Sequence, residues 1–123
     1  MQLNQDCIRD LLLYLEANLS YENNIPIEGL HLNNYSPNDL TYTADKLNEA
    51  NYIKAIKSSC TYKDIPIFIV TDITYSGHQF LDTIRDQSIW ESTKAKASKF
   101  ASISIPILQE LATSFLKDKL GLP

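Results

Sequence analysis

The stretch Tyr35–Ile53 reads Y-S-P-N-D-L-T-Y-T-A-D-K-L-N-E-A-N-Y-I and decides the fold, because it predicts a capped helix that leads directly into a strand. Ser36 stands at the N-cap and Pro37 suits the first helical position, where its missing N–H is not needed. Asp39 completes a variant of the capping box, and Asn51 tolerates the left-handed conformation that ends a helix. The apolar face of this helix carries Leu40, Ala44, Leu47 and Ala50.

The flanking segments supply supports for this helix. Tyr52–Ser59 and Ile65–Asp72 are rich in strand-forming residues and predict a β-hairpin with a polar connection around 60–64. Upstream, Asn4–Asn18 has the periodic apolar stripe of a core helix, with Asn4 as its cap and Asp6 in its first turn. A short strand is expected next, with Gly29 at a bend; its apolar residues are Ile25, Ile27 and Leu30.

The order helix, strand, helix and hairpin predicts an α+β fold of winged-helix type, in which the hairpin is the wing. The linker His31–Tyr35 is too short for a full second helix, which is a departure from a regular helix-turn-helix. Further helices are expected over 74–86, from a cap at Ser88 toward Lys99, and from Ser104 to just before Gly121. We therefore expect one domain, 1–123, with a winged core over 1–86 and a C-terminal helical extension over 87–123.

Composition favours a single soluble domain. The chain has 123 residues, 44% hydrophobic residues and a net charge of -4. Its apolar runs all fall short of the roughly 18 residues that a membrane span needs, so we expect a cytoplasmic protein without membrane contact. Cys7 and Cys60 form neither a metal-binding spacing nor a disulfide framework, and are expected to be reduced thiols.

The charges are distributed unevenly. Residues 1–50 hold two Lys or Arg against eight Asp or Glu, whereas residues 51–123 hold nine against seven. The face of the central helix that we expect to be exposed has Lys46 as its one cation; its other members are Asp39, Thr41, Asp45, Asn48 and Glu49. Such a face would repel phosphates, so any duplex DNA is expected to bind weakly and through its backbone, to the wing residues Lys54, Lys57 and Lys63.

The most specific pattern is I-T-Y-S-G-H-Q-F-L-D-T-I-R-D-Q-S-I-W over 73–90, which we call the 73–90 block. Together with the central helix it resembles a family of small bacterial and prophage proteins known as a domain of unknown function. The family pattern is close to L-T-x-x-G-H-x-F-L-D-x-x-R-D-x-x-x-W and is matched at Thr74, Gly77, His78, Phe80, Leu81, Asp82, Arg85, Asp86 and Trp90. The resemblance covers nearly the whole chain and implies a winged-helix-like fold without an established activity. The chain departs from the family at Thr43, often His there, and at Asn51, often Gly.

The 73–90 block also contains the residue types of a hydrolase triad, Ser76, His78 and Asp82. Side chains on one or two consecutive helical turns rarely converge on one hydroxyl, so we expect a structural role and no catalytic residues. An i,i+4 contact between His78 and Asp82, an ion pair of Arg85 with Asp82 or Asp86, and a buried Trp90 are the expected interactions. With two histidines and three glycines, the sequence contains neither zinc-ligand spacing nor a phosphate-binding glycine motif, so no metal or cofactor is expected.

Two classes of function stay open on the sequence. The first is a weak DNA-binding or transcription-regulatory factor, favoured by analogy of fold. The second is a protein-interaction module or phage accessory factor that does not bind DNA. The last helix also offers an apolar stripe for a homodimer, with intramolecular packing as the alternative; the stripe consists of Leu108, Leu111, Phe115 and Leu116.

Overall fold

The computed structural model of the chain describes residues 2–62, 65–99 and 103–123, and for 58–62 and 65–67 the backbone only. The fold is α+β, as predicted, with an antiparallel three-stranded sheet in the order β1-β3-β2. In chain order the elements are α1 (Gln5–Asn18), β1 (Ile25–Pro26), α2 (Pro37–Glu49), β2 (Ile53–Tyr62), β3 (Ile65–Ile73), α3 (Tyr75–Ile84), α4 (Gln87–Ala97) and α5 (Ile105–Leu120).

Packing divides the chain into two compact units, Met1–His78 and Gln79–Pro123. The first contains α1, α2 and the sheet, and the second contains α4 and α5. The division falls within α3, so the expectation of one domain whose helical extension starts at residue 87 stays a prediction.

Helix α1 forms where the sequence predicted it, because its cap and its apolar stripe agree. The side chain of Asn4 accepts a hydrogen bond of 3.1 Å from the backbone N–H of Cys7, and Asp6 lies in the first turn. One face is fully buried and forms the core of the first unit; it consists of Cys7, Ile8, Leu11, Leu12 and Leu15. Burial also raises the pKa of the Cys7 thiol, which disfavours its reactive thiolate form.

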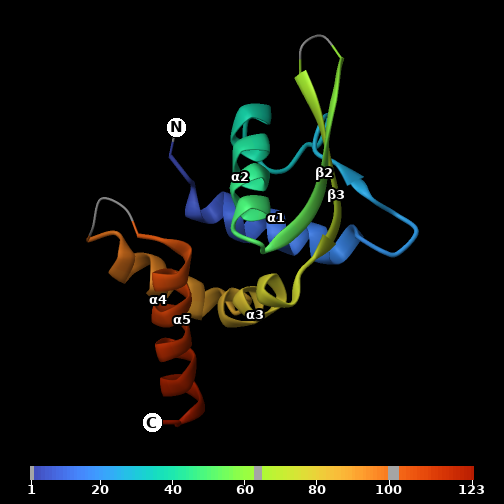
Figure 1. Cartoon of the computed structure of the whole chain (residues 1–123). Helices are drawn as coiled ribbons and strands as arrows, with labels where there is room; N and C mark the ends of the chain where they lie inside the picture. The colour runs from blue at the N-terminus through green and yellow to red at the C-terminus, as the bar shows by residue number, and fades with distance from the viewer. Residues whose placement is uncertain (1, 63–64, 100–102) are drawn as a thin grey trace. The chain divides into compact units, whose positions relative to one another are not determined.

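Helix α2 begins and ends at the predicted signals. The Ser36 side chain accepts a hydrogen bond of 3.1 Å from the backbone N–H of Asp39, and Asn51 has the left-handed φ of 68°. Leu40, Ala44 and Leu47 are buried. Figure 1 shows α1 crossing one end of α2, with the hairpin standing beside α2. The predicted adjacency of helix and wing is therefore confirmed.

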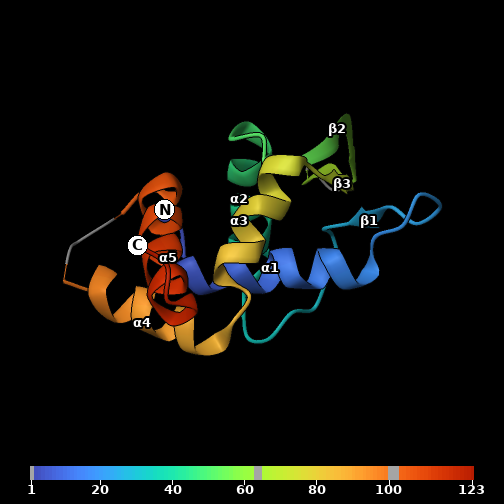
Figure 2. The same cartoon turned by 90° about the horizontal axis from the view of Figure 1, so that it is seen from below.

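The strands differ in length from the prediction. β1 has only two residues, Ile25 and Pro26, which pair with Val70 and Ile69 of β3. Ile27 is buried and donates a backbone hydrogen bond of 2.8 Å to Phe68, although it lies outside β1. Leu30 is not in the strand, because the chain turns at Gly29, whose φ is +74°. Figure 2 shows the chain running from the end of α1 through a turn to β1.

The wing is longer than predicted, because β2 continues past Ser59 to Tyr62. Thr61 and Tyr62 favour strands, and they pair with Pro66 and Ile65 of β3. Cys60 lies in β2, but its side chain falls outside the description, as do the predicted contacts of Lys63.

A loop takes the place of the second helix of a helix-turn-helix, as the short linker indicated. The Tyr35 hydroxyl donates a hydrogen bond of 2.7 Å to Asp10 of α1, and the Asn33 side chain donates one of 3.0 Å to the same carboxylate oxygen. Burial and the Asp10 carboxylate raise the pKa of Tyr35 above its ordinary range. The loop is thus fixed to α1, and the order of elements is winged-helix-like without a second helix.

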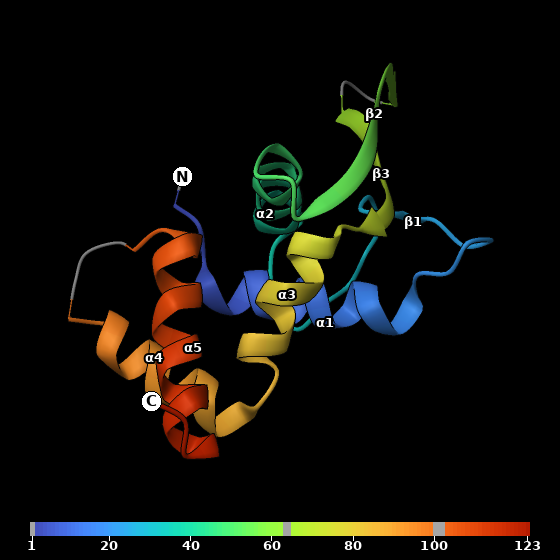
Figure 3. The same cartoon turned by 60° about the horizontal axis from the view of Figure 1, so that its bottom comes forward.

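In the second unit, α4 and α5 lie side by side (Figure 3). α5 follows Ser104, has Pro106 in its first turn and ends at Gly121, whose φ is +74°. α4 ends at Ala97, two residues before the expected limit at Lys99. Its N-cap is Asp86, so the prediction of Ser88 as the cap is wrong. Asp86 accepts a 3.0 Å hydrogen bond from the backbone N–H of Ile89 and a 2.7 Å hydrogen bond from the Ser88 hydroxyl, which makes Ser88 a supporting residue.

Candidate functional site

The wing is the surface predicted to meet any duplex DNA, and its central feature is an ion pair with the neighbouring helix α2. The ammonium of Lys57 on β2 pairs with Oδ1 of Asp45 on α2. Lys57 also lies 5.8 Å from the centroid of the Phe68 ring on β3. The wing lysine is therefore held by a carboxylate and an aromatic ring of its own unit.

Asp45 depends on this lysine. The Oδ1 atom of Asp45 is buried and, within the described part of the chain, has no hydrogen bond, so the Lys57 ammonium is the charge that compensates it. If Lys57 turned toward a phosphate, the Asp45 carboxylate would lose its partner charge; because the Lys57 and Asp45 side chains are 50% and 30% exposed, solvent limits this cost to about 1 kcal/mol. The ion pair therefore opposes the use of Lys57 as a DNA contact.

The other three lysines of α2 and the wing differ in whether they are paired and whether the structure describes them. Lys46 pairs with Glu49 at 2.6 Å, and the carboxylate raises the pKa of Lys46. Lys54 is exposed on β2, and Lys63 lies outside the described residues. Of the two predicted DNA contacts that the structure describes, Lys54 is thus the one without an ion pair to α2.

The exposed face of α2 is narrower than predicted. Asp39 and Glu49 are exposed, whereas Thr41, Asp45 and Asn48 are half-buried, so the expectation that all five face solvent is wrong. Two of them bind the wing: Asp45 through Lys57, and Asn48 by accepting a hydrogen bond of 3.2 Å from the backbone N–H of Ala55. Packing of α2 along β2 is the physical reason, because it turns these side chains toward the strand.

The start of the 73–90 block docks α3 on the turn between α2 and β2. The Thr74 hydroxyl donates a 2.5 Å hydrogen bond to the carbonyl of Asn51 and accepts one of 3.0 Å from the backbone N–H of Gly77. The Thr74 backbone N–H donates to the carbonyl of Tyr52 at 3.1 Å. A Cβ at Gly77 would lie 2.1 Å from that same carbonyl oxygen, so only glycine fits there.

The charged residues of the block stabilise helix ends. Arg85 forms a 2.9 Å ion pair with Asp82, one of the two partners predicted for it. Asp86 instead caps α4 and lies 3.4 Å from the ammonium of Lys119 on α5. The hydrogen bonds from Ser88 and Ile89, together with Lys119, lower the pKa of Asp86 to about 2.

The large apolar residues of the block are buried, as predicted. Phe80 and Leu81 are fully buried, and Trp90 is 1% exposed. Lys94 lies 5.9 Å from the Trp90 ring centroid. Packing is therefore the observed use of these three side chains, while the structural role of the whole block stays a prediction.

The polar residues of the possible triad do not form a catalytic arrangement. Ser76 and His78 are exposed on α3, and the Asp82 carboxylate is bound to Arg85 rather than to His78. Across residues 2–62, 65–99 and 103–123, no three His, Cys, Asp or Glu side chains come together in a group that could hold a metal ion. None of the helices in those ranges is long and apolar enough to cross a membrane.

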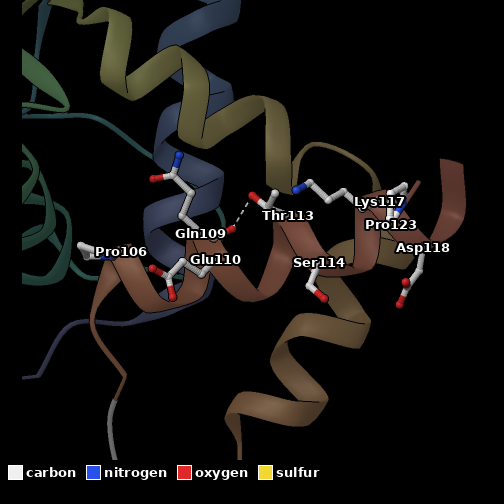
Figure 4. A pocket seen from close by; sticks show the side chains of 8 residues that line it. All are labelled: Pro106, Gln109, Glu110, Thr113, Ser114, Lys117, Asp118 and Pro123. Atoms are coloured by element: carbon white, nitrogen blue, oxygen red, sulfur yellow. Dashed lines mark hydrogen bonds between the residues drawn. The ribbon is translucent and has the colours of Figure 1, made fainter. Parts of the chain in front are cut away.

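The predicted self-association stripe on α5 is partly used within the second unit. Leu108 is 1% exposed, whereas Leu111, Phe115 and Leu116 are half-buried. Lys96 of α4 lies 5.8 Å from the Phe115 ring centroid. Leu108 is therefore unavailable to another copy, and the exposed face of α5 lies elsewhere on the helix. Figure 4 shows part of that face, along which a groove follows the helix.

Comparison with known proteins identifies one family model and a full-length relative. A family model described as "Hypothetical protein (DUF2513)" matches residues 2–104, which ends immediately before α5. A relative from Haemophilus influenzae, described as an uncharacterized protein, is 27% identical over 122 residues, which cover 98% of this chain and 100% of the relative. No solved structure matches the chain.

Proposed function

We propose a function for this chain, which belongs to the DUF2513 family. In our proposal it is a winged-helix-like protein-interaction module and not an enzyme. Its helix α2 and its wing do not read the sequence of duplex DNA. The single observation that carries the proposal is the ion pair between Lys57 and Asp45. A wing that contacts DNA presents its cations to phosphates, whereas here a wing lysine compensates a buried carboxylate oxygen of the helix that would read the bases.

The charge of the first unit supports the same proposal. Residues 1–78 hold five Lys or Arg against ten Asp or Glu. Non-specific DNA affinity comes from cations that neutralise phosphates, and an excess of carboxylates works against that attraction. Of the α2 side chains that are exposed, Asp39 and Glu49 are acidic, so they would meet the phosphates first.

Weak duplex binding through the backbone is the second candidate, and the exposed Lys54 favours it. One or two phosphate contacts would give a dependence of log affinity on log salt of only about -0.9 to -1.8. Such binding would carry little sequence information, because phosphate contacts position a protein without specifying a base.

A titration of a fluorescent random-sequence duplex, followed by anisotropy at low salt, tests the proposal. We expect no saturable binding with a Kd below about 1 µM, which is the tight end of ordinary non-specific DNA binding. Sequence-selective binding in the nanomolar range would overturn the proposal. The variant Lys54→Ala serves as a control, because any weak electrostatic binding should decrease when this exposed cation is removed.

A further inference from the structure

The outer face of α5 carries an acidic and a basic side chain, Glu110 and Lys117, with a second acid, Asp118, beside the lysine. Glu110 and Lys117 are exposed and stand seven residues apart, with Thr113 and Ser114 midway between them. Both charged residues line the groove in Figure 4, one toward each end of the helix. A separation of seven residues is about 10 Å along a helix, which is too long for an ion pair within one chain.

Neither charge is compensated within the described residues. In residues 2–62, 65–99 and 103–123, the side chains of Glu110 and Lys117 form no ion pair or hydrogen bond. In contrast, Lys119 on the same helix is bound to Asp86 and donates a 2.8 Å hydrogen bond to Ser88. The charged side chains on the outer face of α5 are thus unpaired in the described residues, whereas Lys119 is paired with a residue at the start of α4.

Exposed apolar side chains lie at both ends of α5. Ile107 near the start of α5, Leu120 at its end and Leu122 just beyond are 49%, 65% and 52% exposed. Exposed apolar surface of this kind favours association, since its removal from water is stabilising. The small side chains of Thr113 and Ser114 at the centre would let another helix approach closely.

We propose that α5 is the interface of a twofold homodimer, in which two copies of α5 pack antiparallel about Thr113 and Ser114. In this register Glu110 of each copy lies opposite Lys117 of the other, because the two residues are equally distant from the centre. A twofold interface must be complementary to itself, and the two Glu110–Lys117 pairs satisfy that condition, while Asp118 of each copy lies opposite the uncharged Gln109 of the other. The inference rests on the proposed function and names its partner, a second copy of this chain.

Charge reversal tests the register. By sedimentation velocity from about 10 to 200 µM full-length protein, we expect a monomer–dimer equilibrium in the wild type. Each of the single variants Glu110→Lys and Lys117→Glu should raise the dissociation constant of the dimer at least about tenfold. The reason is that either change turns both ion pairs of the dimer into pairs of like charge. The double variant Glu110→Lys/Lys117→Glu should restore dimerisation, because it recreates both pairs with their signs exchanged.

Matched reversals at exposed sites on the first unit serve as controls. Glu22→Lys and Lys54→Glu change the net charge equally and should leave the equilibrium unchanged. A wild type that is monomeric at 200 µM, single reversals without effect, or a folded double variant that stays monomeric would each overturn the interface. Circular dichroism melting shows whether each variant is folded. A monomer that also ignores duplex DNA would contradict the dimer alone, whereas tight DNA binding would contradict the proposed function.

Discussion

Among the three glycines, Gly77 has the most restrictive environment. The carbonyl oxygen of Tyr52 lies 2.1 Å from the position of a Cβ at Gly77, and a side-chain methyl of Ile73 lies 2.7 Å from it. Tyr52 contributes backbone atoms here, which cannot move without shifting the turn between α2 and β2. The left-handed Asn51 occupies that turn and supplies the carbonyl that accepts the hydrogen bond of Thr74. The same backbone segment therefore contacts both Thr74 and Gly77 at the start of the 73–90 block.

The variant Gly77→Ala should therefore be destabilised by about 1–3 kcal/mol or more, as for other insertions into packed sites. Urea unfolding followed by far-ultraviolet circular dichroism measures this change. Ser76→Ala, one position earlier and exposed, is the control and should change the free energy of unfolding by less than about 0.5 kcal/mol. Equal stability of Gly77→Ala and wild type would show that α3 is not held against the turn in this way.

Asp86 predicts a specific dependence of stability on pH. Its pKa is lowered from the ordinary 3.8 to about 2, so the charged form is favoured in the folded state. The stabilisation by its charge is complete above the ordinary value and is lost as the pH falls through about 2. Asp86→Asn keeps a capping side chain but removes the charge, so it should be less stable than wild type at pH 6, with the difference shrinking from pH 4 to 2. Urea unfolding over this range measures it, and a difference that stays constant down to pH 2 would exclude this role of the carboxylate.

Helix α4 packs through one large buried side chain. Trp90 is 1% exposed, and Trp→Ala changes in packed sites cost about 3–5 kcal/mol. We expect Trp90→Ala to lower the unfolding free energy by that amount, a large share of the stability of a small protein. Gln87→Ala, an exposed change on the same helix, should have little effect. If Trp90→Ala left the thermal midpoint unchanged, packing would not be the role of this residue.

The helices were predictable from sequence because their signals are local. The caps at Asn4 and Ser36 and the left-handed Asn51 depend on residues within three or four positions of one another. The error at α4 lay between two neighbouring candidates, because Asp86 and Ser88 are both good caps; in the structure the Asp86 carboxylate accepts the N–H of Ile89 and the Ser88 hydroxyl binds that carboxylate. The end of β2 was missed because strand pairing extended it beyond its alternating stretch.

At the scale of the whole molecule, the sequence identified the acidic helix and the basic wing but not their connection. Asp45 and Lys57 were each assigned to a surface, one repelling and one attracting DNA. Neither periodicity nor composition shows that these two side chains meet, because their contact depends on how α2 packs along β2. The same packing half-buries Asn48, which binds the strand through Ala55. The observed fold is thus close to the predicted one, whereas the predicted DNA-contact site had to be revised because of contacts between α2 and β2.

We propose that the ion pair with Asp45 keeps Lys57 from contacting DNA, and the salt dependence of duplex binding is the measurement that decides this. We predict that Asp45→Asn, which removes the charge opposite Lys57, binds a random duplex more tightly than wild type at low salt. Its slope of log affinity against log salt should be steeper by about 0.9, the effect of one additional phosphate contact. Asp39→Asn removes the same charge from the same helix while Lys57 stays paired, and should not steepen the slope. A wild type that already binds with nanomolar affinity and a steep slope, unchanged by Asp45→Asn, would contradict the claim.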